Sequence, residues 1–343
     1  MAKATRITQK DLAEKAGVTQ ATVSLALSNH FSISPETRAR IQGIAEKMGY
    51  QPDPYLSGLS AYRKRVRSPR FQATLAWLSN YPASTPWKQQ STLLNYFEGA
   101  KERARELGYQ LEEHELTAPG MTSARLERIF AARNIPGILL MPQPKAGMQL
   151  DFCFDRFSAV SFGYTLEKPQ LHLVALQQFR SVETAFRKLI SLGYRRPGLA
   201  MALESDKRAD RNWSAAFWMS QRQLPQRDRI PLLLQQPLHR TTFMKWYQRY
   251  RPDVIISMGT YVYEWLRAEG VAVPEETGFS LLSVPDEGAF YSGIWENPRV
   301  IGAKAVDFLV DLVHRNECGC PTVPLSMLVS GTWVDGKTIR AQT

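Results

Sequence analysis

The chain has 343 residues, of which 44% are hydrophobic and 22% are charged, which excludes a disordered protein and predicts two or three globular domains. Its longest apolar runs fall short of the roughly 20 residues that a membrane span needs, so we expect no membrane partner. The net charge is +11, and residues 1–70 hold twelve Lys and Arg against five Asp and Glu, which predicts a polyanionic partner at the N-terminal end.

Three short helices are predicted in the first 50 residues. Thr8 is a typical N-cap of the first helix, and Gly17 ends it because glycine readily adopts the left-handed C-cap conformation. Thr19 begins the second helix, while the third begins after Ser34 and ends at Gly49. Two helices joined by a turn of about four residues that contains glycine are typical of a helix-turn-helix. A generic three-helix bundle is the alternative.

Four short motifs mark this segment. In chain order they are Ala16-Gly17-Val18-Thr19, Thr22-Val23-Ser24, Ile33-Ser34-Pro35-Glu36-Thr37-Arg38 and Met48-Gly49-Tyr50-Gln51-Pro52. Together they resemble the DNA-binding headpiece of the lac-repressor (LacI/GalR) family of transcription regulators. The resemblance assigns residues 1–52 to an all-α helix-turn-helix headpiece that binds double-stranded DNA.

The same resemblance implies which headpiece side chains meet DNA. Gln20, Ala21 and Leu25 would face base edges in the major groove, where Gln can pair with adenine and Ala can touch a thymine methyl group. Leu25 departs from the family, in which Arg often reads guanine at this place, so the half-site should differ there. The other expected DNA contacts are Thr8, Thr19, Thr22, Ser24, Asn29 and Tyr50.

Residues 53–70 are predicted to be a hinge helix followed by a basic linker. In the family, a short helix here folds on DNA and inserts a leucine into the minor groove. Leu59 falls at that position, and Leu56 lies on the same helical face. Gly58 departs from the pattern because it lowers helix stability, and a plain linker is the alternative.

From residue 71 onward, short apolar runs alternate with amphipathic helical stretches, as in βα units of a parallel sheet. Looser motif matches, such as residues 189–196 and 270–278, resemble the family's regulatory core. That resemblance implies an α/β periplasmic-binding-protein-like core over residues 71–343, made of two parallel-sheet subdomains. We expect the N-subdomain at about 71–170 plus 298–325, and the C-subdomain at about 171–297 plus the C-terminal segment.

A cleft between the subdomains would bind the small-molecule effector. Arg211 matches the family's effector-contacting arginine, and an arginine can clamp a carboxylate or a pair of hydroxyls. The other expected cleft residues are Trp87, Gln177, Trp213, Asp286 and Trp295. A sugar is one candidate effector, although the chain lacks the acidic pairs that relatives place there. Surface exposure for Arg211 and core packing for each tryptophan are the alternatives.

No catalytic motif stands out, so we expect neither an enzyme nor a cofactor or metal site. Cys153, Cys318 and Cys320 are odd in number, which favours free thiols in the reducing cytoplasm over a disulfide framework or half a metal site. We predict a cytoplasmic, homodimeric regulator that represses transcription from a pseudo-palindromic operator under effector control. A solute-binding protein, a doubly wound enzyme with a DNA-binding tail and a regulator without an effector remain alternatives.

Overall fold

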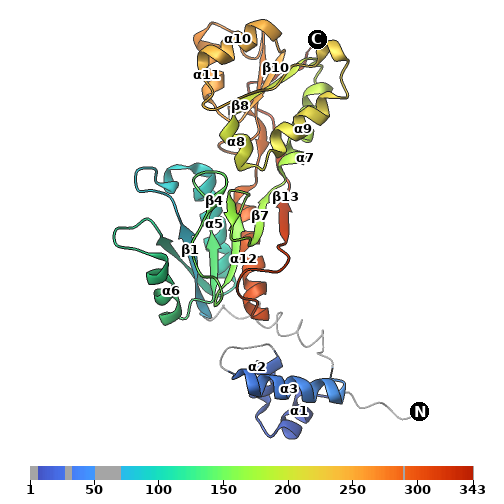
Figure 1. Cartoon of the computed structure of the whole chain (residues 1–343). Coiled ribbons are helices and arrows are strands. Elements are labelled where there is room, and N and C mark those ends of the chain that lie inside the picture. Colours follow the sequence, from blue (N-terminus) through green and yellow to red (C-terminus); the bar gives the residue numbers. More distant parts are fainter. Residues whose placement is uncertain (1–6, 28–32, 51–70, 289, 343) are drawn as a thin grey trace, which may run out of the picture.

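The computed structural model describes residues 7–27, 33–50, 71–288 and 290–342 of the chain (Figure 1). The headpiece consists of α1 (Gln9–Ala16), α2 (Gln20–Leu27) and α3 (Pro35–Met48). These helices share one small core, whose fully buried side chains are Leu12, Val23, Ala26 and Ile41. All three helices begin and end within a residue or two of the positions expected from their caps, so the helix-turn-helix prediction is confirmed.

Local side chains set the ends of the headpiece helices. The Thr8 side chain accepts a hydrogen bond from the backbone N–H of Asp11, and the carboxylate of Asp11 accepts one from the backbone N–H of Thr8 in return. The hydrogen bonds that this carboxylate accepts from the backbone N–H and the hydroxyl of Thr8 hold the pKa of Asp11 below its usual range. Gly17 and Gly49 close α1 and α3 in the left-handed conformation, as predicted.

The first subdomain of the core is built on a six-stranded parallel sheet in the order β13-β7-β5-β3-β1-β2. Its strands are β1 (Ala73–Ser79), β2 (Tyr109–Glu115), β3 (Gly137–Leu140), β5 (Ser158–Phe162), β7 (His172–Leu176) and β13 (Ser326–Val329). A short pair, β4 (Met148–Gln149) and β6 (Leu166–Lys168), stands apart from this sheet. Helices α5 (Ser91–Glu106) and α12 (Pro298–Arg315) cover one face of it, and α6 (Ser123–Ala132) covers the other.

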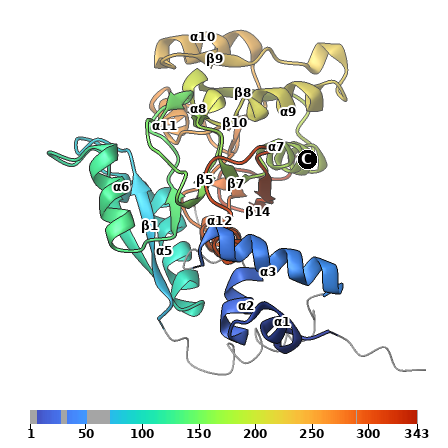
Figure 2. The ribbon, with the colours of Figure 1, turned by 60° about the horizontal axis from the view of Figure 1, so that its bottom comes forward.

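The second subdomain contains a second six-stranded sheet in the order β14-β12-β11-β10-β8-β9. Its strands are β8 (Pro197–Ala202), β9 (Leu233–Gln235), β10 (Val254–Ser257), β11 (Gly278–Leu281), β12 (Ser292–Trp295) and β14 (Thr332–Val334), the last antiparallel to β12. Its helices are α7 (Gln178–Ser191), α8 (Leu203–Arg208), α9 (Asn212–Gln221), α10 (Arg240–Tyr250) and α11 (Tyr261–Ala268), with single turns η1 (Trp87–Gln89) and η2 (Gln226–Asp228) elsewhere in the core. Figures 1 and 2 show the two subdomains as separate lobes, with α10 and α11 in the second lobe. The predicted fold class is thereby confirmed.

Two of the expected subdomain boundaries shift. Strand β7 begins after residue 170 and β13 begins after residue 325, yet both strands pair within the first sheet. The chain therefore enters the second subdomain after Leu176, and it returns there after Val329. The sequence pattern missed this because β7 and β13 pair with each other across about 150 residues of chain, which periodicity does not report.

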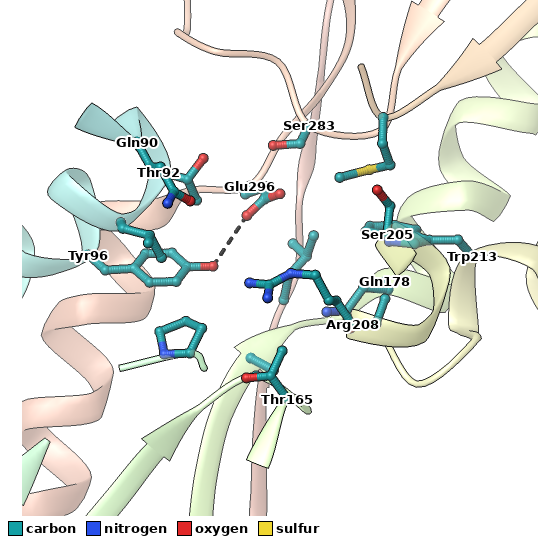
Figure 3. A pocket seen from close by; sticks show the side chains of 17 residues that line it. Gln90, Thr92, Tyr96, Thr165, Gln178, Ser205, Arg208, Trp213, Ser283 and Glu296 are labelled. Carbon is teal, nitrogen blue, oxygen red and sulfur yellow. Dashed lines mark hydrogen bonds between the residues drawn. The ribbon is translucent and has the colours of Figure 1, made fainter. Parts of the chain in front are cut away.

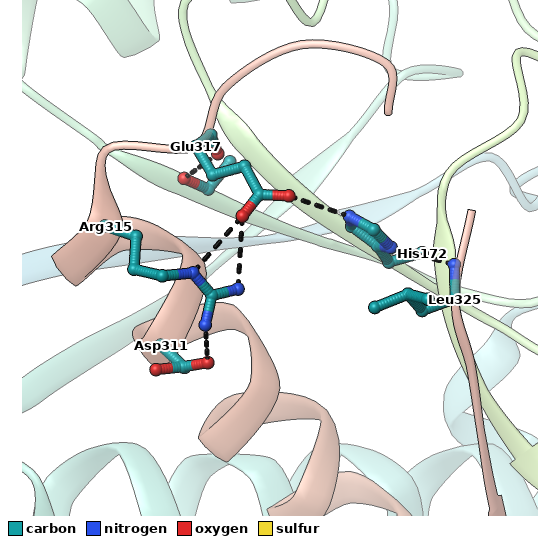
Figure 4. A network of polar contacts seen from close by, with 6 residues as sticks. His172, Asp311, Arg315, Glu317 and Leu325 are labelled. Carbon is teal, nitrogen blue, oxygen red and sulfur yellow. Dashed lines mark hydrogen bonds and ion pairs between the residues drawn. The ribbon is translucent and has the colours of Figure 1, made fainter. Parts of the chain in front are cut away.

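A polar network ties the C-terminal end of α12 to the first sheet (Figure 4). Nδ1 of the buried His172 accepts a hydrogen bond of 3.0 Å from the backbone N–H of Leu325. The neutral ring therefore carries its proton on Nε2, which lies 3.3 Å from Oε1 of Glu317. Glu317 also pairs with Arg315 at 3.1 Å, and Arg315 pairs with Asp311. The network thus anchors the segment that leads from α12 into β13.

Within the described part of the chain, every helix is too short or too polar to span a lipid bilayer.

Candidate functional sites

Helix α2 presents one polar face to solvent. Val23 and Ala26 are buried in the headpiece core, whereas Gln20, Ala21 and Ser24 are exposed on the other side of the helix. Side chains three and four residues apart share a face of an α-helix, so these three exposed residues form a continuous strip. The strip contains the amide of Gln20, which can both donate and accept a hydrogen bond from a base edge.

Five other residues expected at DNA lie within the described part of the headpiece. Thr19 caps α2, because its hydroxyl accepts a hydrogen bond of 3.1 Å from the backbone N–H of Thr22 and lies 2.8 Å from the Thr22 hydroxyl. Leu25 is half-buried, and Tyr50 packs against the headpiece core. Thr8 stands at the beginning of α1 in the capping box. Asn29, Leu56 and Leu59 lie outside the described residues, as does the predicted hinge over residues 53–70.

A cavity of about 260 Å³ lies between the two subdomains of the core (Figure 3). The first subdomain contributes Tyr96 from α5 and Thr165 from the loop before β6, while the second contributes Arg208 from α8 and Trp213 from α9. Glu296 lies where the chain crosses from β12 to α12. The volume is slightly below the roughly 300–1,000 Å³ of drug-sized pockets, so it suits a small metabolite.

Hydrogen bonds cross this cavity and join the subdomains. Nη1 of Arg208 donates to the carbonyl oxygens of Gln143 and Pro144, at 2.6 and 2.8 Å. A third bond of 2.8 Å runs from the backbone N–H of Ala146 to Oε1 of Glu204, also on α8. Since residues 143–146 follow β3 of the first sheet, the three bonds hold α8 against the opposite subdomain. They would break if the cleft opened.

Glu296 is a buried carboxyl group at the hinge side of the cavity. It accepts a hydrogen bond of 3.3 Å from the hydroxyl of Tyr96 and another from Ser283. Burial raises the pKa of Glu296, and the two hydrogen bonds offset only part of that increase. Burial, with the nearby Glu296, also raises the pKa of Tyr96 well above its ordinary value, so Tyr96 stays protonated and donates.

A pH-dependent stability follows from the raised pKa of Glu296. In the folded chain Glu296 binds its proton more tightly than in the unfolded chain, so its contribution is largest at low pH. That contribution declines as the pH rises through the folded pKa. We expect Glu296→Gln to abolish this decline and to stabilise the core relative to the parent at pH 8 more than at pH 5. Urea unfolding at both pH values measures the free energy of unfolding of the two proteins. If the variant and the parent differed by the same amount at pH 5 and pH 8, the expectation would be wrong.

Of the residues expected in the cleft, Trp213 lines the cavity. Trp87 does not: it is buried in the first subdomain, where it packs against Trp77 and Phe97. Trp295 packs into the core of the second subdomain instead. Trp87 is thus packed as a core residue, while Trp295 is half-buried against the second core, and effector contact by either stays a prediction.

Three expected polar residues also lie outside the cavity lining. Arg211 is the N-cap of α9 and adopts the left-handed conformation at φ 58°. Gln177 precedes α7, and the next residue, Gln178, lines the cavity in its place. Asp286 is exposed in a turn, where its carboxylate accepts a hydrogen bond from the backbone N–H of Gly288. The arginine that lines the cavity is Arg208, three residues before Arg211, and effector contact by Arg211 stays a prediction.

Sequence reasoning missed Arg208, Tyr96 and Glu296. A signal existed for Arg208, because α8 directly follows β8, and ligands of parallel sheets lie at the carboxyl ends of strands. Tyr96 lies inside an amphipathic helix, where an aromatic residue reads as core. Nothing in the local pattern marks Glu296 as buried.

Comparisons with known proteins find relatives for the N-terminal segment and for a longer part of the chain. Residues 8–53 match the family described as "Bacterial regulatory proteins, lacI family". The chain is 27% identical over 192 residues to the HTH-type transcriptional regulator PtxS of Pseudomonas plecoglossicida, a match that covers 56% of this chain. That match spans 52% of PtxS, so the chain spans about half the length of this curated relative.

Solved structures share the fold at low sequence identity. A complex of the transcriptional regulator CelR with cellobiose is 17% identical, covers 97% of this chain and 100% of its own, and has a TM-score of 0.56. The lac repressor dimer bound to operator and the anti-inducer ONPF is 15% identical, with 98% and 100% coverage and a TM-score of 0.56. A LacI transcription regulator from a Rhodococcus species is 14% identical, with 78% and 98% coverage and a TM-score of 0.58.

These structures establish the fold of headpiece and core, and the motifs of residues 8–53 carry the family's own pattern. Residues 8–53 are thus similar to the lacI family of bacterial regulatory proteins, and the chain shares the fold of solved regulators of that type.

Proposed function

We propose that the chain is a sequence-specific DNA-binding regulator of transcription, whose affinity for its operator depends on a small molecule in the cavity between the subdomains. The observation that carries the proposal is the exposed strip of α2, in which Gln20, Ala21 and Ser24 face solvent while the opposite side is core. A helix of eight residues with this exposure can enter the major groove of DNA.

In this proposal the chain forms a homodimer, and the dimer binds a pseudo-palindromic operator. One headpiece helix covers only a few base pairs, so two copies held by the core provide the affinity and set the spacing of half-sites. The structure of the lac repressor dimer bound to operator supports this arrangement. We assign repression as the direction of control, the cytoplasm as the compartment, and binding in place of catalysis as the activity.

Control by ligand follows from linkage. A ligand changes operator affinity only through its different affinity for two states of the protein. The bonds from Arg208 to Gln143 and from Ala146 to Glu204 exist only when the cleft is closed. A ligand that fills the cavity would therefore shift the subdomains relative to each other, and with them the two linkers that carry the headpieces. The CelR complex with cellobiose shows that this fold can hold a small ligand.

The test is selection of operator sequences from random DNA by the full-length protein, with and without a pooled metabolite library. A palindrome whose enrichment changes with metabolites is the expected result. A palindrome that no metabolite affects would support the DNA-binding part and contradict effector control. Absence of any enriched site would contradict the regulator itself.

A further inference from the structure

The charge of the cavity indicates what kind of ligand it binds. Arg208 and Glu296 are the only charged side chains among its lining residues. Within the described part of the chain, no carboxylate forms an ion pair with Arg208, whose guanidinium bonds to two backbone carbonyls through Nη1. Figure 3 shows this side chain extending from α8 toward Tyr96, across the cavity. Its Nε and Nη2 groups bond to no other described residue and remain for a ligand.

Nearby acidic groups leave the charge of Arg208 uncompensated. Glu296 accepts hydrogen bonds from Tyr96 and Ser283 and forms no ion pair with Arg208 among the described residues. On α8 itself, Asp206 is buried and accepts hydrogen bonds of 2.9 and 2.7 Å from the backbone N–H and hydroxyl of Ser214. Glu204 bonds to the backbone of Ala146. A half-buried cation without a counter-ion favours an anionic ligand.

The remaining lining is polar but uncharged. Gln178 is 9% exposed, and its Oε1 has no hydrogen-bond partner among the described residues. A buried acceptor without a donor is unfavourable, so a donor from a ligand would stabilise it. Thr165, Ser205 and Thr92 add hydroxyl groups around the same space, and Trp213 offers an aromatic face. Such a lining matches a molecule with several hydroxyl groups.

We propose that the effector is a polyhydroxylated carboxylic acid of about four to six carbon atoms, a size set by the volume of the cavity. Its carboxylate binds the Nε and Nη2 edge of Arg208 in a bidentate pair, and one of its hydroxyls donates to Oε1 of Gln178. The inference rests on the proposed function, since it names the ligand class of that same cavity. It places the specificity of the site in Arg208, not in Arg211.

The experiment compares aldonic acids with the alditols of the same carbon number, which carry CH₂OH in place of the carboxylate. Four-, five- and six-carbon pairs, up to gluconate and sorbitol, are titrated into the full-length protein by calorimetry. We expect one acid to bind at least about tenfold more tightly than its alditol, because a charge-assisted bidentate pair is lost with the carboxylate.

Arg208→Gln should remove most of this preference, so that the acid and its alditol bind with similar affinity. Lys207→Gln is the matched control, because it removes the same charge from an exposed position of the same helix, and it should keep the preference. Thermal unfolding without ligand shows that both variants are folded.

Three results would overturn the inference: equal binding of acid and alditol, no binding by any acid of the series, or equal effects of the two variants. Operator binding without ligand is measured in parallel. An operator that is bound and then released only by a neutral compound would reject the acid while the regulator stands. Acid binding without any operator would reject the proposed function while the ligand class stands.

Discussion

Replacing Gln20 with alanine is expected to lower the affinity for the selected operator by about 10- to 100-fold for each half-site. Gln20 is exposed at the first position of α2, and a bidentate contact from Gln to adenine contributes about 1–3 kcal/mol of discrimination. In a dimer the loss occurs in both half-sites, so this is the largest change that we expect from a single substitution. Binding to unrelated DNA should change little, because Gln20 carries no charge.

The measurement is fluorescence anisotropy with operator and with scrambled DNA over a series of salt concentrations. The slope of affinity against salt should stay that of the parent, since no phosphate contact by a cation is removed. Gln110→Ala, the same change at an exposed position of β2, is the control and should leave both affinities unaltered. An equal loss of affinity for operator and scrambled DNA would contradict base reading by Gln20.

Gly302→Ala is expected to destabilise the core by about 2 kcal/mol. Helices α5 and α12 cross so closely that a Cβ on Gly302 would overlap the carbonyl oxygen of Tyr96, and one on Gly99 would overlap that of Arg299. Because the overlapping atoms are backbone, the helices must separate, and overpacking of this kind costs about 3 kcal/mol. The better helix propensity of alanine returns about 1 kcal/mol.

The midpoint of thermal unfolding of the core should fall by about 4–8 °C. Gly43→Ala is the matched control, because Gly43 lies inside α3 and a Cβ there would meet nothing within 4 Å. That variant should stabilise the headpiece by about 1 kcal/mol through helix propensity alone. If Gly302→Ala and Gly43→Ala shifted stability in the same direction, close packing of α5 on α12 would not be the reason for glycine at 302.

The packing of α5 on α12 also bears on the geometry of the ligand cavity. Gly302 is not among the residues that line the cavity, although its neighbour across the helix pair, Tyr96, donates to Glu296. A loss of packing at Gly302 should therefore also loosen Tyr96 and weaken the bond to Glu296. This link connects the stability of the first subdomain to the geometry of the ligand site.

How much the sequence predicts depends on the range of the interactions. The headpiece could be predicted almost residue by residue, because its caps at Thr8 and Ser34 and its stops at Gly17 and Gly49 act within one helical turn. Alternation of apolar runs and amphipathic helices likewise predicted an α/β core of two sheets. These signals are local, so they are readable in the order of the residues.

The sequence did not predict which strands belong to which sheet. His172–Leu176 and Ser326–Val329 are apolar runs that could pair in either sheet, and only the tertiary structure assigned both to the first. Similarly, the sequence alone does not distinguish a tryptophan that lines a cleft from one in the core, and only the structure shows that Trp87 is buried and Trp295 half-buried. Propensity and periodicity carry no information about such distant pairings.

The sequence by itself therefore determined the helix-turn-helix and the two-subdomain core. Only the tertiary structure decided which residues form the ligand cavity, because Tyr96, Arg208 and Glu296 come from three segments more than 80 residues apart. Their meeting depends on strand order and on the crossovers between the sheets, and each residue alone looks like an ordinary helix or loop position. Interactions between neighbouring residues can be predicted from the order of the residues, whereas a site assembled by long-range packing forms only when the chain folds.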